Sequence, residues 1–134
     1  MSEENVEIVR LGFKHLLATG ELLENIFAPG FVLDMSTFRD LMDLQSHYEG
    51  ADGMRRFLRE WTEPFEEWQI EVDALHDAGD KVVALCQQHA RAKASELPVD
   101  MRLAMVFTLR DGLQTRIEMY ADPSAALKAV GLKE

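Results

Sequence analysis

The chain has 134 residues, of which 47% are hydrophobic, so it has the size of one domain, spanning 1–134, and can bury a substantial core. Asp and Glu number 24 against 14 Lys and Arg, and this formal net charge of -10 argues against nucleic acid or an anionic membrane surface as a partner. Residues 1–5 lack the basic and apolar regions of a signal peptide, and no apolar run approaches the roughly 20 residues that span a bilayer, so we expect a cytoplasmic protein.

The first third of the chain predicts two helices and one strand. Apolar residues recur at helical spacing over 6–17 and stop at Gly20, a pattern typical of an amphipathic helix with a glycine cap. We expect a second, short helix over 21–28 and a strand over 31–35. Mixed signals over 36–48 favour a loop with one helical turn.

A broad apolar stripe predicts a long third helix that begins near Gly50. Its members share helical spacing: Met54, Phe57, Leu58, Trp61, Phe65 and Trp68. Pro64 predicts an end or a kink in the last turn of this helix, because proline cannot donate a helical hydrogen bond.

After Trp68 the hydrophobic period changes from helical to two, which predicts four strands in a meander. Turns are expected at 78–80, at 96–98 and at 111–112, where Asp-Gly is the strongest hairpin signal of the chain. Asp122 and the proline after it open a final short helix. Helices segregated from an antiparallel sheet predict an α+β domain, in which the sheet curls around the long helix and leaves a cavity.

Alternation along the strands assigns the two faces of the sheet. In the last two strands, over 101–109 and 113–119, the odd positions are apolar apart from Thr115, so we expect them to face inward and even positions such as Gln114 to face outward. In the preceding strand the expected inner row is Val82, Ala84, Cys86, Gln88 and Ala90. The outer face then carries Leu85, Val106 and Tyr120, which favours a homodimer contact, with an ordinary amphipathic surface as the alternative.

Several stretches resemble SnoaL-like proteins of the nuclear transport factor 2 (NTF2)-like superfamily: residues 32–36, 48–57 with Trp61, 78–83, 108–112 and 120–132. The resemblance implies an NTF2-like cone with a strongly curved sheet, a pocket at one end and commonly a dimer. It implies no fixed chemistry, since the superfamily includes cyclases, isomerases, hydrolases, dehydratases and proteins that only bind. Many catalytic relatives place a histidine and an aspartate in the last strand, where this chain has Ile117 and Met119.

Asp34 is the first candidate for acid/base catalysis, because apolar residues flank it on a predicted strand beside the pocket. An apolar wall raises the pKa of a carboxyl group into a range that suits a general acid or base. The alternative is a carboxylate that hydrogen-bonds the loop near Ser36 or points to water. His47 and Tyr48 could reach the pocket mouth as further catalytic candidates, and their alternatives are a loop residue and a packing anchor.

Ten residues are candidates for the pocket lining, although such a stripe is also typical of plain core. They are Phe38, Met42, Phe57, Trp61, Cys86, Gln88, Met105, Phe107, Ile117 and Met119. Gln88 could orient a ligand carbonyl or ring oxygen, or it could satisfy the hydrogen-bonding needs of Asp34. Cys86 has no cationic neighbour on its row to lower the pKa of its thiol, so we expect it to be inert. The four histidines and single cysteine lack metal-ligand spacing, so we expect neither a metal nor another cofactor.

Two main functions remain open from the sequence. The chain binds a small apolar molecule, or it is an acid/base enzyme of the isomerase, cyclase, dehydratase or hydrolase type that uses Asp34 on such a substrate. A third hypothesis is that the chain is a non-catalytic dimerisation or interaction module. A fully packed cone would favour an interaction role, and an open cavity with Asp34 exposed to it would favour the enzyme.

Overall fold

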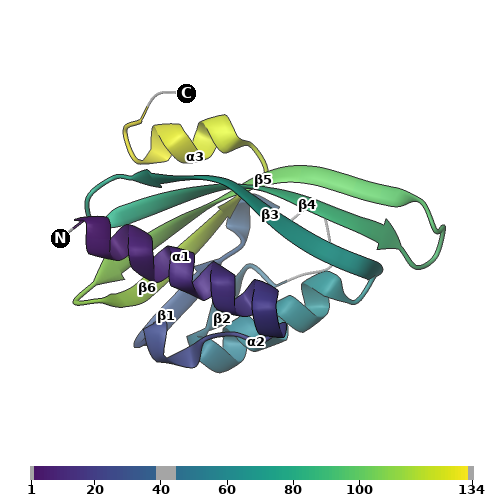
Figure 1. The fold of residues 1–134 in the computed structure, drawn as a ribbon, viewed down its shortest axis with the longest axis horizontal. Coiled ribbons are helices and arrows are strands. Elements are labelled where there is room, and N and C mark those ends of the chain that lie inside the picture. The colour runs from purple at the N-terminus through teal and green to yellow at the C-terminus, as the bar shows by residue number, and fades with distance from the viewer. Residues whose placement is uncertain (1, 39–44, 133–134) are drawn as a thin grey trace.

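The computed structural model describes residues 2–38 and 45–132, in which one sheet has the strand order β2-β1-β6-β5-β4-β3 (Figure 1). The strands are β1 (Phe27–Asp34), β2 (His47–Glu49), β3 (Phe65–Asp77), β4 (Lys81–Ala92), β5 (Pro98–Arg110) and β6 (Leu113–Tyr120). The helices are α1 (Ser2–Thr19), α2 (Gly50–Thr62) and α3 (Pro123–Ala129), with 3-10 turns η1 (Glu24–Ile26) and η2 (Ser36–Phe38). β1 and β6 are parallel and the other neighbouring pairs are antiparallel, which confirms the α+β class.

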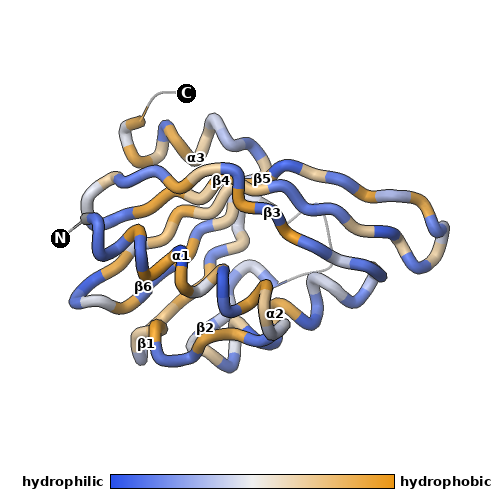
Figure 2. The backbone as a smooth tube through the Cα atoms, in the orientation of Figure 1, coloured by the Kyte–Doolittle hydropathy of each residue, from blue (hydrophilic) through white to orange (hydrophobic). Residues whose placement is uncertain are grey.

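The sheet is strongly curved, and α1 and α2 lie against its concave face while α3 lies on the other (Figure 1). Hydrophobic and hydrophilic residues alternate along these elements in Figure 2, as elements with one buried face require. Most of the core fills the space between α1, α2 and the sheet, and a smaller cluster lies under α3. In the part of the chain that the structure describes, none of the helices has the length and apolar content needed to cross a bilayer.

The prediction of a helix over 21–28 is wrong. α1 ends as expected, since Gly20 has a φ of 77° and its N–H donates to the carbonyl of Leu16 at 2.8 Å. Only η1 follows, and β1 already begins at Phe27. Pro29 lies within β1, where the register against β6 shifts between Phe27 and Val32. A proline has no N–H to offer a neighbouring strand, so the chain bulges there while remaining extended.

The long helix is shorter than predicted. α2 ends at Thr62, and the following Glu63 and Pro64 lead into β3, so Phe65 and Trp68 belong to a strand. Of the two effects predicted for Pro64, an end or a kink of the helix, the end is therefore confirmed. Trp68 fits the helical stripe by coincidence, because it packs against the same core from β3.

The alternation of faces is confirmed for most positions. The odd residues of β5 and β6 that form core are Leu103, Met105, Phe107, Leu109, Ile117 and Met119, and the inner row of β4 is buried as predicted. Gln114 and Leu113 are exceptions, since Gln114 is only 2% exposed, whereas Leu113 pairs with Arg110 and is only partly buried. β5 and β6 shift register after Thr108, so that Leu109 pairs with Gln114 and Thr115 is left over. The Thr115 hydroxyl donates to the Thr108 carbonyl at 3.2 Å, and this bulge turns Gln114 inward.

Part of the apolar outer face is covered by α3. Val83 and Val106 pack against Ala126 and Leu127, and Leu85 and Tyr120 are only partly buried beside them. The Asp122 side chain caps this helix by accepting the Ser124 N–H at 3.0 Å. The chain's own last helix therefore accounts for much of the apolar character on this face, and the homodimer stays a prediction.

Candidate functional site

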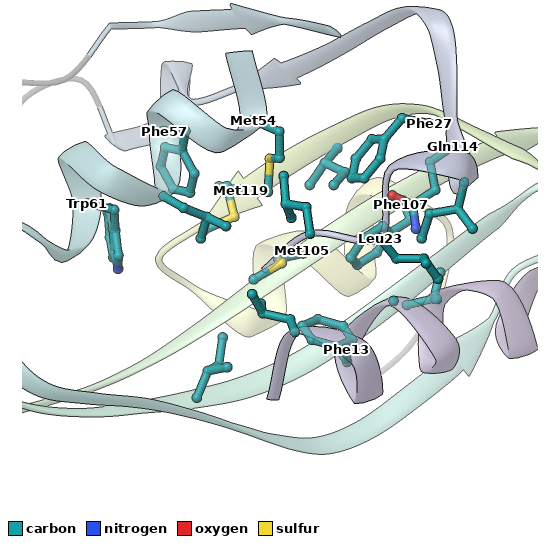
Figure 3. A pocket seen from close by; sticks show the side chains of 18 of the residues that line it. Phe13, Leu23, Phe27, Met54, Phe57, Trp61, Met105, Phe107, Gln114 and Met119 are labelled. Atoms are coloured by element: carbon teal, nitrogen blue, oxygen red, sulfur yellow. The ribbon is translucent and has the colours of Figure 1, made fainter. Parts of the chain in front are cut away.

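An apolar cavity lies between α1, η1, α2 and the concave face of the sheet (Figure 3). Its volume is about 70 Å³. Among the described residues, Gln88 and Gln114 are the polar members of the lining, and hydrophobic side chains and Gly12 form the rest. In Figure 3, Phe13 approaches from α1, Met54 and Phe57 from α2, and the sulfur of Met105 lies near the centre.

Seven of the predicted lining residues do line the cavity: Phe57, Trp61, Gln88, Met105, Phe107, Ile117 and Met119. Cys86 is buried outside the lining, and burial, with a smaller effect of the Asp73 charge, raises the pKa of its thiol to about 12. Such a thiol carries almost no thiolate at neutral pH, as expected for an inert core residue. Met42 and the side chain of Phe38 lie outside the described residues.

The wall that faces the sheet was not predicted from the sequence. This wall consists of residues from α1, η1 and the segment between them: Val9, Gly12, Phe13, Leu16, Leu22, Leu23 and Ile26. The apolar stripe of α1 predicted that Val9, Phe13 and Leu16 face the core, but the stripe alone does not say which cavity they border. Gln114 was missed for a different reason, because the bulge at Thr115 inverts the alternation on which its outward assignment depended.

Gln88 is held by two tryptophans from different elements. The indole N–H groups of Trp61 in α2 and Trp68 in β3 both donate to its side-chain oxygen, the second at 2.8 Å. Because an indole nitrogen can only donate, the acceptor between the rings must be the amide oxygen. The amide nitrogen of Gln88 is then buried and has no hydrogen-bond partner among the described residues. The suggestion that Gln88 satisfies Asp34 is therefore wrong.

Gln114 is the second amide in the cavity lining and lies near Gly12 of α1. Its side-chain oxygen is buried without a hydrogen-bond partner in the described part of the chain. A Cβ atom at Gly12 would lie 2.9 Å from Ile26 Cδ1, which is too close, whereas its 3.8 Å to Gln114 Nε2 would be an ordinary contact, so the glycine leaves room for Ile26. Trp61 and Gln114 lie toward opposite ends of the cavity in Figure 3.

The cavity opens into a wider groove between the end of α1, the following segment, α2 and β3. The two spaces share six residues at their junction: Leu16, Leu22, Leu23, Leu58, Trp68 and Ile70. The groove also has polar and charged residues, among them Glu24, Arg55, Arg59 and Gln69. Arg55 forms ion pairs with Glu24 and with Asp52. A molecule that enters thus passes from a charged rim to an apolar interior.

Asp34 does not line this cavity and belongs to the opposite face of the sheet. Its carboxylate pairs with Arg116, lies 3.8 Å from His47 Nε2 and accepts the Ser36 N–H at 2.8 Å. Burial acts to raise the pKa of Asp34, but hydrogen bonding by Ser36 and the charges of Arg116 and His47 outweigh it and lower the pKa. The expectation of a raised pKa is wrong, and the alternative of a carboxylate bonded to the loop at Ser36 is confirmed.

We expect Asp34→Asn to lower the free energy of unfolding by about 1 kcal/mol at pH 7, a modest loss because Arg116 is 39% exposed. A lowered pKa in the folded state stabilises the protein above the unfolded-state pKa, and this contribution is lost as the pH falls through the folded-state pKa. Urea unfolding at pH 7, 5 and 3 should therefore show a difference between wild type and variant that shrinks toward pH 3. A constant or growing difference would contradict this role.

His47 and Tyr48 lie outside the cavity lining as well. His47 is exposed on β2 beside Ser46, with 3.1 Å between His47 Nδ1 and the Ser46 hydroxyl. Tyr48 is 1% exposed, and its hydroxyl donates to Glu60 at 2.6 Å and accepts the Gln45 N–H at 3.2 Å. Burial and Glu60 raise the pKa of Tyr48 to about 12. Its geometry matches the alternative of a packing anchor.

The sequence pattern of the SnoaL-like domain matches residues 18–117, which include β1 to β5, the first part of β6 and most of the cavity wall. The chain belongs to the SnoaL-like family. No curated protein sequence matches it. In the described residues of this SnoaL-like domain, no group of three or more His, Cys, Asp or Glu side chains could hold a metal ion.

Solved structures share the fold of this SnoaL-like domain at low sequence identity. TerC co-crystallised with polyporic acid is 17% identical, with a TM-score of 0.74 over 95% of this chain and 98% of that one. An NTF2-like protein from Burkholderia thailandensis is 21% identical, with a TM-score of 0.74 over 92% of this chain and 95% of that one. A protein with a ketosteroid isomerase-like fold from Catenulispora acidiphila, in complex with trimethylamine, is 18% identical, with a TM-score of 0.70 over 94% of this chain and 93% of that one. These likenesses confirm the NTF2-like cone.

Proposed function

We propose that this SnoaL-like domain binds a small, neutral, largely apolar molecule in the cavity and does no acid/base chemistry on it. One observation carries the proposal: among the described lining residues, no side chain is titratable. A general acid or base must lie within hydrogen-bond reach of the proton that it transfers. The two glutamines and the two indoles can orient a ligand but cannot exchange a proton with it near neutral pH.

The positions of the three catalytic candidates support binding over catalysis. Asp34 lies on the outer face with its carboxylate in an ion pair, and its lowered pKa keeps it charged. Tyr48 points to Glu60, and His47 is exposed on β2. From the sequence, an open cavity with Asp34 exposed to it would favour an enzyme. An open cavity is present here, but Asp34 does not line it.

The size of the cavity limits the part of a ligand that can be enclosed. Pockets for drug-sized ligands usually measure roughly 300–1,000 Å³, whereas this cavity has about 70 Å³. We therefore infer that about one ring of the ligand is enclosed and that any larger part lies in the groove at the mouth. Met54, Met105 and Met119 line the cavity, and their flexible side chains allow it to adjust to the ring.

Toluene is a suitable probe, because it is one apolar ring with no group to be protonated. We expect saturable binding of one toluene per chain, measured by isothermal titration calorimetry or by ligand-detected NMR. Leu58 lies at the junction of cavity and groove, so Leu58→Trp should weaken toluene binding about tenfold by narrowing the passage and filling the entrance.

Leu11→Trp is the matched control, since Leu11 is 51% exposed and lines neither the cavity nor the groove. It should bind toluene like the wild type. Absence of saturable binding to the wild type, or equal binding by Leu58→Trp and Leu11→Trp, would contradict the proposed function.

A further inference from the structure

Gln88 presents a hydrogen-bond donor that the protein leaves unused. The residue is 0% exposed and lines the cavity, and its amide nitrogen has no partner in the described part of the chain. Buried polar groups are almost always hydrogen-bonded, because an unsatisfied donor loses its bonds to water without compensation. An acceptor from outside the protein is therefore expected at this position.

The orientation of this amide is fixed. Its oxygen accepts from Trp61 and from Trp68, which come from α2 and β3 and approach from two sides. A flip of the amide would remove both bonds and place the NH₂ group against two further donors. Gln88 can thus offer its N–H groups to a ligand, and it cannot exchange them for an acceptor.

We propose that Gln88 binds a carbonyl oxygen, so that the ligand of this cavity is a neutral ketone, aldehyde or ester with an otherwise apolar ring. This inference rests on the proposed function and names the chemical class of its ligand. Apart from Gln114, which lies toward the opposite end of the cavity from Trp61 (Figure 3), the rest of the lining offers an apolar surface that suits the ring. The unused N–H of Gln88 then gives the carbonyl a defined direction within that surface.

Other acceptors fit this site less well. A carboxylate would have to leave water for a cavity whose described lining residues include no cationic side chain, in a chain with a net charge of -10. A hydroxyl group can accept from Gln88, but its own proton then needs an acceptor. The two lone pairs of the Gln88 oxygen are already used by the two indoles, and the Gln114 oxygen belongs to the opposite end of the cavity from Trp61 (Figure 3). A carbonyl oxygen accepts and brings no proton of its own.

Two probes of the same shape test this inference. Cyclohexanone and methylenecyclohexane differ only in the exocyclic atom, which is a carbonyl oxygen in the first and a CH₂ group in the second. A cavity that is apolar throughout prefers methylenecyclohexane, because the carbonyl loses its hydrogen bonds to water on entry. A cavity in which Gln88 donates to the carbonyl prefers cyclohexanone. The two tryptophans of the chain both contact Gln88, so intrinsic fluorescence reports occupancy of this site.

We expect the wild-type protein to bind cyclohexanone about fivefold to tenfold more tightly than methylenecyclohexane, as one satisfied hydrogen bond provides. Gln88→Met should reverse this preference. Gln87→Met is the matched control on the same strand, since the Gln87 amide donates to Asp73 on the outer side, and it should keep the wild-type preference. The wild-type comparison needs no variant, so the test holds even if Gln88→Met fails to fold.

Tighter binding of methylenecyclohexane by the wild type would overturn the carbonyl inference and leave the proposed function in place. Retention of the cyclohexanone preference in folded Gln88→Met would overturn it too, because another group would then bind the carbonyl. If neither probe binds saturably, the proposed function fails and this inference fails with it. As an independent readout, the carbonyl stretch of bound cyclohexanone should lie at a lower frequency than in an alkane solvent.

Discussion

Phe107→Ala is expected to lower the free energy of unfolding by about 3–5 kcal/mol and to enlarge the ligand cavity at the same time. Phe107 is 5% exposed and lies on β5 between Val82 of β4 and Ile117 of β6. Its ring lines the cavity and meets the edge of Phe13 at a centroid distance of 5.8 Å. Removal of the ring therefore costs burial, one aromatic contact and close packing between α1 and the sheet.

Urea unfolding of wild type and Phe107→Ala measures the loss, which corresponds to a fall in melting temperature of roughly 10–20 °C. Phe65→Ala makes the same change at the start of β3, where the ring is only partly buried, and should cost less than half as much. The enlarged cavity should also bind toluene more tightly than the wild-type cavity, so that toluene stabilises the variant more. Equal losses in the two alanine variants would contradict the central position of Phe107.

The joint effect of Phe107→Ala on stability and on cavity size follows from the different roles of the two faces of the sheet. The inward side chains of β5 and β6 form the core and the cavity wall at once, so stability and ligand size depend on the same residues. The outward side chains form ion pairs, such as those of Arg116 with Asp34 and with Glu118. A change in outer charges is therefore expected to alter stability and its pH dependence while leaving the affinity for a neutral ligand unchanged.

Alternation in the sequence predicted this division well, because the period of a strand is strict and one face is buried. Met105, Phe107 and Met119 lie inward, as their odd positions required. Gln114 could not be placed in the same way, since one additional residue in β6 reverses the parity and alternation cannot show where a bulge falls. Thr115, the polar member of an apolar row, was the available signal for it.

Asp34 shows a second limit of sequence reasoning. Its apolar neighbours in sequence suggested an apolar environment, but successive strand residues point to opposite faces, and its nearest groups come from Ser36, His47 and Arg116. The pairing of β1 with β6 brings Arg116 to it across 82 positions of sequence. A pKa depends on such spatial neighbours, so its direction could not be predicted from the flanking residues.

The second large effect is expected at Tyr48, where Tyr48→Ala should cost about 3–5 kcal/mol of unfolding free energy. Tyr48 is 1% exposed on β2, its ring meets the edge of Phe57 at 5.5 Å, and the Arg56 guanidinium carbon lies 5.2 Å from the ring centroid. These contacts join the short edge strand to α2. The backbone of Tyr48 also lies close to the helix, since a Cβ at Gly53 would lie 3.1 Å from the Tyr48 carbonyl carbon.

Tyr48→Phe separates the ring of Tyr48 from its hydroxyl group. The phenylalanine keeps the ring contacts and removes the bond to Glu60, so it should cost only about 1 kcal/mol, with toluene and cyclohexanone affinities unchanged. Chemical denaturation and ligand titration of both variants below their melting temperatures measure these effects. If Tyr48→Phe retained its stability but lost ligand binding or a turnover found in the wild type, Tyr48 would be a functional residue. The packing that places it behind Phe57, outside the cavity lining, favours the opposite result.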